Sequence, residues 1–196
     1  MNSGLHRELL ALRDIDFQRR EELVREGTLF DGYHPRMEAV HLQNAARLKE
    51  IIRENGWPSG KLVGEDGAEA AWLIVMHAIS DPAFQREMLA VLKAAAAQGE
   101  APAYQPAYLE DRICMYEGRP QIYGTQFTVD DEGRPAIWTI SDPEHVNERR
   151  AAIGLDTIEH RTEQMLRETS SDARPKDMSA YRQGYEDWLR RVGWRD

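Results

Sequence analysis

Apolar residues recur at three- and four-residue steps through the first hundred positions, which is the period of helices buried on one face. The pattern predicts helices over residues 3–25, 37–54, 66–79 and from 82 onward. Ser3 can cap the first helix, and Gly56 and Pro58 end the second. The third, AEAAWLIVMHAI, is apolar on every side after its first turn, which predicts a central buried helix with His77 inside the apolar run.

Between residues 111 and 140 short β-favouring runs alternate with two near-identical turns, EGRP at 117–120 and at 132–135. We interpret them as three antiparallel strands over residues 111–116, 121–129 and 136–140. Alternation would place Arg112, Cys114, Gln121, Tyr123 and Thr125 on one face, and Asp111, Ile113, Met115, Ile122 and Gln126 on the other. Gly124 would leave a gap for a ligand or another backbone. The predicted fold class is α+β and predominantly helical, a helical core with a three-stranded antiparallel β-meander.

Further helices are expected up to about residue 168, after which the composition changes. We predict a main domain over residues 1–169, a linker over 170–177 and a carboxy-terminal helix within 178–196. That helix carries Tyr181, Tyr185 and Trp188 on one side. It is expected to dock either on the main domain or on a second subunit, which would make the protein a homo-oligomer.

The composition is that of a globular protein, with 41% hydrophobic and 30% charged residues among 196. The net charge of −9 argues against nucleic acid or an anionic membrane surface as a partner. Cys114 is the only cysteine, so no intramolecular disulfide can form. No stretch is apolar enough to span a bilayer, and the amino terminus lacks the pattern of a signal peptide. We therefore expect a cytoplasmic protein.

The segment DRICMYEGRPQIYGTQ, residues 111–126, concentrates polar side chains among apolar ones. We predict a pocket between this segment and the helix that carries His77. There is no glycine-rich phosphate loop, no nucleophile elbow and no pair of histidines at metal-ligand spacing. A zinc site would have to join distant segments, for example His41, His77 and Asp111. No metal and no cofactor are assigned on this basis.

Several motifs resemble those of an uncharacterised bacterial family, a domain of unknown function. They are GWP at 56–58, the helix with Trp72 and His77, DPAFQ at 81–85, AYLEDR at 107–112, QIYGTQ at 121–126 and VNERRAAIGL at 146–155. Asp16, Gln18 and Arg20 are similar to a motif that precedes them. Met76 departs from the glutamine expected before His77. The resemblance implies no known activity, but it implies that Asn44, Gln85 and the polar residues of 111–126 belong to a shared pattern.

The first functional hypothesis is an enzyme or binding protein for a small polar ligand, with hydrolase- or transferase-type acid–base chemistry. His77 would act as acid or base, Asp111 would orient His77 or Arg112, and Arg112 would clamp an anion. The substrate-binding residues would be Asn44, Gln85, Gln121, Tyr123, Thr125 and Gln126. Each has a structural alternative, such as a core histidine, an ion pair or a hydrogen-bonding strut. The second hypothesis is a non-catalytic interaction protein whose polar cluster is scaffolding.

Overall fold

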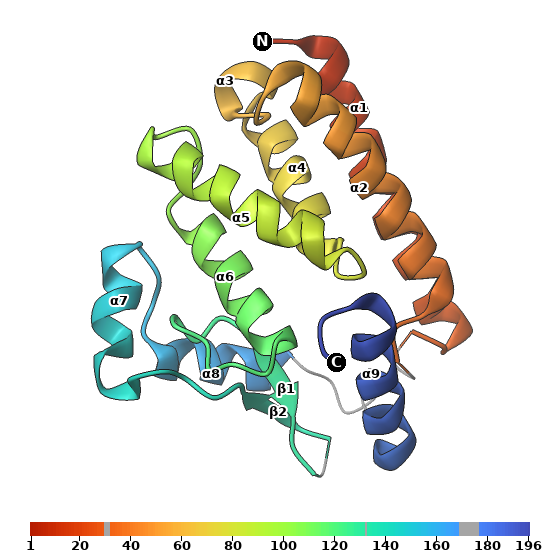
Figure 1. The fold of residues 1–196 in the computed structure, drawn as a ribbon, viewed down its shortest axis with the longest axis vertical. Helices are drawn as coiled ribbons and strands as arrows, with labels where there is room; N and C mark the ends of the chain where they lie inside the picture. The colour runs from red at the N-terminus through yellow and green to blue at the C-terminus, as the bar shows by residue number, and fades with distance from the viewer. Residues whose placement is uncertain (30–31, 132, 169–176) are drawn as a thin grey trace. The chain divides into compact units, whose positions relative to one another are not determined.

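The computed structural model describes residues 1–29, 32–131, 133–168 and 177–196. The described residues form two compact units, one of Met1–Leu29 with Tyr33–Gln105, and one that contains Pro106–Asp196. Most of them are helical, and the only strands among them are two short ones (Figure 1). The helical majority of the predicted fold class is thus confirmed. None of the described helices has the length and apolar character that crossing a bilayer requires.

The first unit is a helical bundle built around α4. Its elements are α1 (Ser3–Glu26), α2 (Pro35–Asn55), α3 (Gly60–Val63), α4 (Glu65–His77) and α5 (Pro82–Ala97). α4 contacts all four other helices, as its apolar surface predicts (Figure 1). The buried residues of the other helices include Leu9 and Leu23 of α1, Leu48 of α2 and Phe84 of α5.

Local signals set the ends of these helices. The side chain of Asn2, and not that of Ser3, accepts hydrogen bonds from the first turn of α1. Gly27 ends α1 in a left-handed conformation with a φ of 70°. Asp81 caps α5 by accepting from the backbone of Phe84, and Pro82 occupies the first turn.

The second unit contains α6 (Tyr104–Tyr116) from Pro106 onward, followed by mixed elements. These are β1 (Phe127–Val129), β2 (Pro135–Ile137), a 3₁₀ turn (Pro143–His145), α7 (Val146–Ala152), α8 (Ile158–Glu168) and α9 (Met178–Val192). β1 and β2 pair antiparallel, with Thr128 opposite Ala136. Trp188 of α9 and Trp194, which follows the helix, both pack on the ring of Tyr116 at the end of α6.

The prediction of a first strand over residues 111–116 was wrong, because these residues form the end of α6. The buried residues Leu109, Ile113 and Tyr116 follow helical spacing, which a window that begins at residue 111 cuts short. The two faces predicted by alternation therefore do not exist. Residues 121–126 are not a regular strand either, and the sheet has two strands instead of three. Gln121 makes only an isolated bridge to Ile140.

The domain prediction is not tested by these elements. Residues 170–176 of the predicted linker lie outside the described residues. The boundary at residue 169 and an oligomer formed through the last helix stay predictions.

Candidate metal centre

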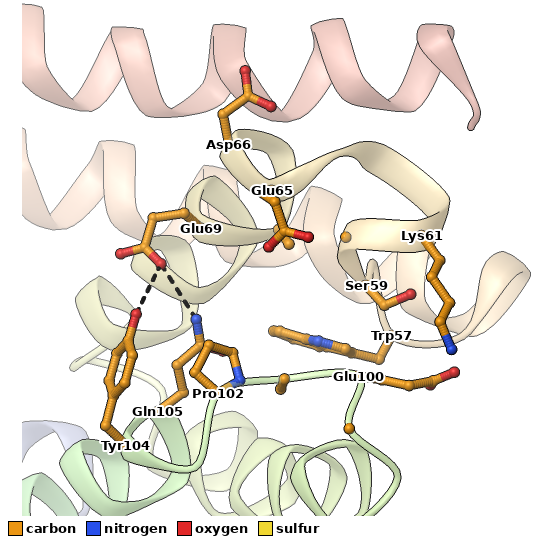
Figure 2. Close-up of a pocket in the computed structure, with 14 residues that line it drawn as sticks. Trp57, Ser59, Lys61, Glu65, Asp66, Glu69, Glu100, Pro102, Tyr104 and Gln105 are labelled. Atoms are coloured by element: carbon orange, nitrogen blue, oxygen red, sulfur yellow. Dashed lines mark hydrogen bonds between the residues drawn. The ribbon is translucent and has the colours of Figure 1, made fainter. Parts of the chain in front are cut away.

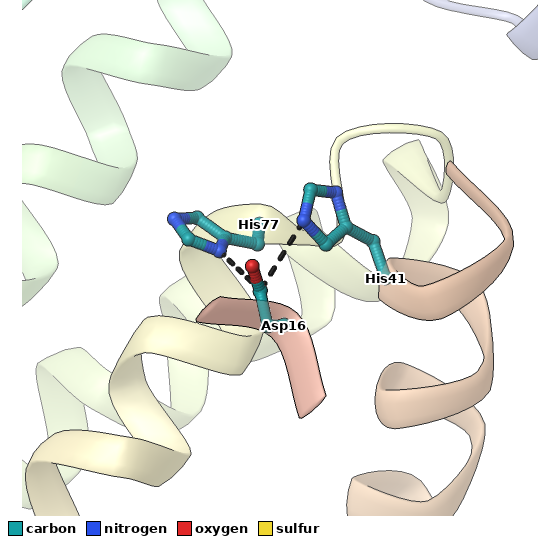
Figure 3. Close-up of side chains that lie close together, drawn as sticks. All are labelled: Asp16, His41 and His77. Carbon is teal, nitrogen blue, oxygen red and sulfur yellow. Dashed lines mark hydrogen bonds and ion pairs between the residues drawn. The ribbon is translucent and has the colours of Figure 1, made fainter. Parts of the chain in front are cut away.

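Three helices of the first unit bring Asp16, His41 and His77 together (Figure 3). Asp16 lies in the middle of α1, His41 in the second turn of α2, and His77 is the last residue of α4. The side chains of Asp16 and His41 are buried, with 3% and 8% of their surface exposed, whereas that of His77 is 30% exposed. The cluster is therefore embedded in the bundle and reachable from the side of His77.

The contacts within the cluster converge on one carboxylate oxygen. His77 Nδ1 lies 2.6 Å from Asp16 Oδ2, at hydrogen-bond distance. His41 Nε2 lies 3.2 Å from the same oxygen. The two imidazole rings are tilted by 42°, with their centroids 4.9 Å apart. Tyr33 approaches His41 from the other side, since its hydroxyl lies 2.6 Å from His41 Nδ1.

The charge state of Asp16 follows from competing effects. Burial by itself would raise the pKa of Asp16, but the close approach of the His41 and His77 imidazoles outweighs it and holds the pKa well below its ordinary value. Asp16 is thus an anion in the interior of the bundle. A buried carboxylate needs cationic or hydrogen-bonding partners, and the two histidines supply them.

Two atoms of the cluster remain unsatisfied. Asp16 Oδ1 and His41 Nε2 are buried, and neither has a hydrogen-bond partner among the described residues. His41 Nε2 is close enough to Asp16 for an ion pair, but the hydrogen-bond geometry is not met. If His41 donates its Nδ1 hydrogen to the Tyr33 hydroxyl, Nε2 presents a lone pair to the cluster. That tautomer is the one that ligates a metal through Nε2.

The donor set fits a divalent transition-metal ion. Each of Asp16, His41 and His77 offers one ligand atom, and these three atoms lie within 4.8 Å of one another. Ligands at zinc bond lengths of about 2.0–2.1 Å in a tetrahedron are about 3.4 Å apart. The 3.2 Å spacing of His41 Nε2 and Asp16 Oδ2 matches this value, and the 2.6 Å spacing of His77 Nδ1 and Asp16 Oδ2 needs to open by less than 1 Å. Two imidazoles and one carboxylate are a common ligand set for zinc and for non-haem iron.

Two residues that the sequence assigned to substrate binding donate hydrogen bonds to the backbone of helices in this cluster. Asn44 donates its side-chain amide to the carbonyl oxygen of Leu12, four residues before Asp16 on α1. Gln85 is fully buried and donates to the carbonyl oxygens of Val75 and Met76, directly before His77. Both side chains act as struts, which was the structural alternative for Asn44.

The other predicted site residues lie in the second unit, where they build a network of their own. Asp111 is fully buried and accepts hydrogen bonds from the backbone amides of Ile122, Tyr123 and Thr125, and from the Thr125 hydroxyl. Burial holds the pKa of Asp111 above its ordinary value, and these four donors offset only part of that rise. The carboxylate at hydrogen-bond distance from His77 is that of Asp16, and Asp111 accepts from the 122–125 loop, so its catalytic role stays a prediction.

The amides around this loop are also paired. The side chain of Gln121 donates to the carbonyl oxygens of Gln126 and Trp138 and accepts from the backbone amide of Gln126. Arg112 donates to the side-chain oxygen of Gln126. Sequence analysis overlooked Arg150, which is 2% exposed and donates to the carbonyl oxygen of Tyr123, 2.7 Å away. These contacts indicate a loop scaffold.

Sequence analysis placed Asp16 in a family motif but gave it no role in the site, and it gave His41 no role beyond the zinc alternative. A signal for Asp16 was present, since it falls on the stripe of α1 that contains the buried residues Leu9 and Leu23. For His41 the sequence offers only its place on the buried face of α2. Neither position shows that the two side chains meet His77.

Fold and cluster together define a mainly helical protein with an Asp-His-His centre in its first unit. Residues 3–171 match the model of a family of unknown function, DUF6624. The match spans most of the chain, so the protein belongs to this family, and the resemblance to an uncharacterised family is confirmed. No curated protein and no solved structure matches the chain.

Proposed function

We propose that the protein is a metalloenzyme that binds a divalent transition-metal ion, of the class of zinc, through Asp16, His41 and His77. The observation that carries the proposal is the buried Asp-His-His cluster with two unsatisfied atoms, Asp16 Oδ1 and His41 Nε2. Buried polar groups in folded proteins are nearly always paired, and a metal ion bound by His41 Nε2 and by the Asp16 carboxylate would give both groups a partner. The substrate class stays as the sequence suggests, a small polar molecule, and the reaction is of hydrolytic or related acid–base type.

The three ligands leave at least one coordination position for water or substrate, as in catalytic zinc sites. A bound ion would supply Lewis-acid chemistry and lower the pKa of water in that position. Access is from the side of His77, the least buried of the three side chains. Closed structural zinc sites usually use four protein ligands, so three ligands favour a catalytic site.

The chain's own residues prepare this site. Asp16 supplies a fixed negative charge, because its pKa lies well below the ordinary value. Tyr33 holds His41 by the Nδ1 contact and stacks on its ring with the centroids 5.7 Å apart. Such outer partners orient metal-ligating histidines. Gln85 fixes the last turn of α4 and with it the backbone of His77.

A second candidate is acid–base chemistry without a metal, with His77 as the acid or base and Asp16 as the group that orients it. The 2.6 Å contact between His77 Nδ1 and Asp16 Oδ2 favours this candidate, since a carboxylate behind a histidine fixes the tautomer of the ring. In that case the unsatisfied atoms of Asp16 and His41 have no explanation.

Metal analysis separates the two candidates. The full chain is dialysed against a chelator, reloaded with Zn²⁺, Mn²⁺ or anaerobic Fe²⁺, desalted and analysed by plasma mass spectrometry. We expect about one equivalent of one of these metals per chain, and less than about a tenth of that in Asp16→Asn and His41→Gln. His160→Gln is the matched control, because His160 lies outside the cluster with its side chain 51% exposed.

Circular dichroism of each variant verifies that it is folded. A wild-type chain that holds none of the three ions would contradict the metal proposal and leave the His77–Asp16 pair as the working group. An equal loss of bound metal in His160→Gln and His41→Gln would also contradict the metal proposal, because it would indicate metal binding by scattered surface histidines.

A further inference from the structure

An open pocket of about 640 Å³ lies at the amino-terminal end of α4 in the first unit (Figure 2). α4 is 13 residues long, and at about 1.5 Å per residue its first residue, Glu65, lies roughly 18 Å along the axis from His77. The pocket is therefore separate from the Asp-His-His cluster. Its volume falls in the range of small-molecule sites, about 300–1,000 Å³.

Negative charge dominates the lining of this pocket. It contains the carboxylates of Glu65, Asp66, Glu69 and Glu100 and the single ammonium of Lys61, so four negative charges against one leave an excess of three. Asp66 is paired with His6, and Glu69 accepts from the Gln105 side chain at 3.3 Å. Glu65 and Glu100 make no side-chain hydrogen bond or ion pair with any described residue.

Trp57 adds an aromatic side chain to this negatively charged lining. Figure 2 shows the Trp57 indole edge-on, between Glu65 on the helix above and the segment of Glu100 and Pro102 below. Trp57 is only partly buried and lines the pocket, so part of its side chain is available to a ligand. A cation over an indole face and beside carboxylates gains from both, and tryptophan is the best aromatic partner for it.

Ser59 provides an independent indication of a ligand. It lines the pocket and is 6% exposed, yet its hydroxyl makes no hydrogen bond with any described residue. The residue is buried, but its hydroxyl is not one of the fully buried unsatisfied atoms, so it is open to the pocket and can donate or accept a hydrogen bond with a ligand there. The acidic residues alone are also explained by the start of α4, where negative charge is favourable, but the Ser59 hydroxyl is not.

The position of the Glu65 carboxylate depends on the absence of a side chain at Gly60. A Cβ atom at Gly60 would lie 2.3 Å from Glu65 Oε1, so any larger residue would displace the carboxylate. The glycine thus lets the Glu65 carboxylate lie against the backbone of α3. This gives a variant that moves the charge without removing it.

We propose that this pocket binds a small organic cation, a primary amine or guanidinium on a short aliphatic chain. The Glu65 and Glu100 carboxylates would hold the charged group by charge-assisted hydrogen bonds, Trp57 would cover its apolar part, and Ser59 would supply a further hydrogen bond. The cation is either a free amine or the side chain of a peptide, since both present the same group.

The test is calorimetric titration of the full chain with agmatine, which carries an amine and a guanidinium, and with an arginine-containing tetrapeptide. We expect agmatine to bind, and Glu65→Gln and Gly60→Ala each to weaken binding about tenfold or more through the lost or displaced carboxylate. The control is Glu21→Gln on α1, which removes the same charge from an exposed position outside the pocket and should leave binding unchanged. Tighter binding of the peptide than of agmatine would identify a protein side chain as the source of the cation.

Three results would overturn the proposal. They are the absence of binding by both probes, equal weakening in Glu21→Gln and Glu65→Gln, and displacement of agmatine by Mg²⁺ as effective as by a second amine at the same ionic strength. The last two would indicate a general field of negative charge. Dialysis against a chelator should not change agmatine binding, so failure here and failure of the metal centre are distinguishable.

Discussion

Replacing Asp111 with asparagine separates a structural role from the catalytic role that the sequence suggested. Asp111 accepts from the amides of Ile122, Tyr123 and Thr125 over 2.7–3.1 Å, and from the Thr125 hydroxyl at 3.0 Å. An asparagine keeps one acceptor oxygen and turns an NH₂ group toward the remaining donors. In either orientation of the amide at least one buried backbone N–H, of Ile122 or of Thr125, loses its partner.

The magnitude follows from these contacts. An unpaired buried N–H costs about 1–3 kcal/mol, and the hydrogen bonds that remain weaken because their acceptor is no longer charged. We expect Asp111→Asn to lower the free energy of unfolding by about 2–4 kcal/mol, a large share of the roughly 5–15 kcal/mol of an ordinary domain. Thr125→Val removes the hydroxyl that donates to Asp111 and accepts from the Gln126 side chain, but keeps every backbone donor of Asp111, and should cost about 1–2 kcal/mol.

Urea unfolding, followed by circular dichroism and by tryptophan fluorescence, measures these losses. Because the described residues form two units, two transitions can occur, and the loss should then fall on the one reported by Trp138, Trp188 and Trp194 of the second unit. A loss below about 0.5 kcal/mol in Asp111→Asn would refute the scaffold role of Asp111. The metal content of Asp111→Asn should equal that of the wild type.

Three further outcomes follow from single contacts. Tyr33→Phe should weaken metal binding about 10- to 100-fold, as measured by competition with a chelating dye, because the partner of His41 Nδ1 is lost. Gly124→Ala should lower the free energy of unfolding by more than about 1 kcal/mol, since φ is +69° and a Cβ would lie 2.7 Å from another side chain, whereas Gly184→Ala in a helix with open space should not destabilise. Arg150→Met should destabilise the second unit by about 2–4 kcal/mol in urea unfolding, because three backbone carbonyls lose a buried donor.

The candidate functional residues form two groups, one expected to affect metal binding and one expected to affect stability. Substitutions at Asp16, His41 and His77 should change metal content, whereas substitutions at Asp111, Gln121 and Gln126 should change stability. A reversal of this pattern would return the functional site to the segment over residues 111–126. The hypothesis of a non-catalytic interaction protein stays a prediction until metal binding is measured.

The sequence by itself determined the four long helices of the first unit, but not the short helix α3. Their apolar stripes and stops are local, and a stripe of period 3.6 with a glycine or proline at its end is helical in almost any context. The same reasoning failed at residues 111–116, where a six-residue window of β-favouring side chains concealed a helix that began at Tyr104. The helical spacing of Leu109, Ile113 and Tyr116 becomes evident only when the buried face is known.

Only the tertiary structure decided what the polar residues do. The sequence marked His77, Asp111 and Gln121 as members of one site, because polar residues among apolar ones require partners. The sequence could not identify these partners. Asp16 lies 61 residues from His77 along the chain, whereas the donors to Asp111 lie 11–14 residues from it. Hydrogen bonds reach about 3 Å, and separations of that order between distant segments are set by the packing of whole helices.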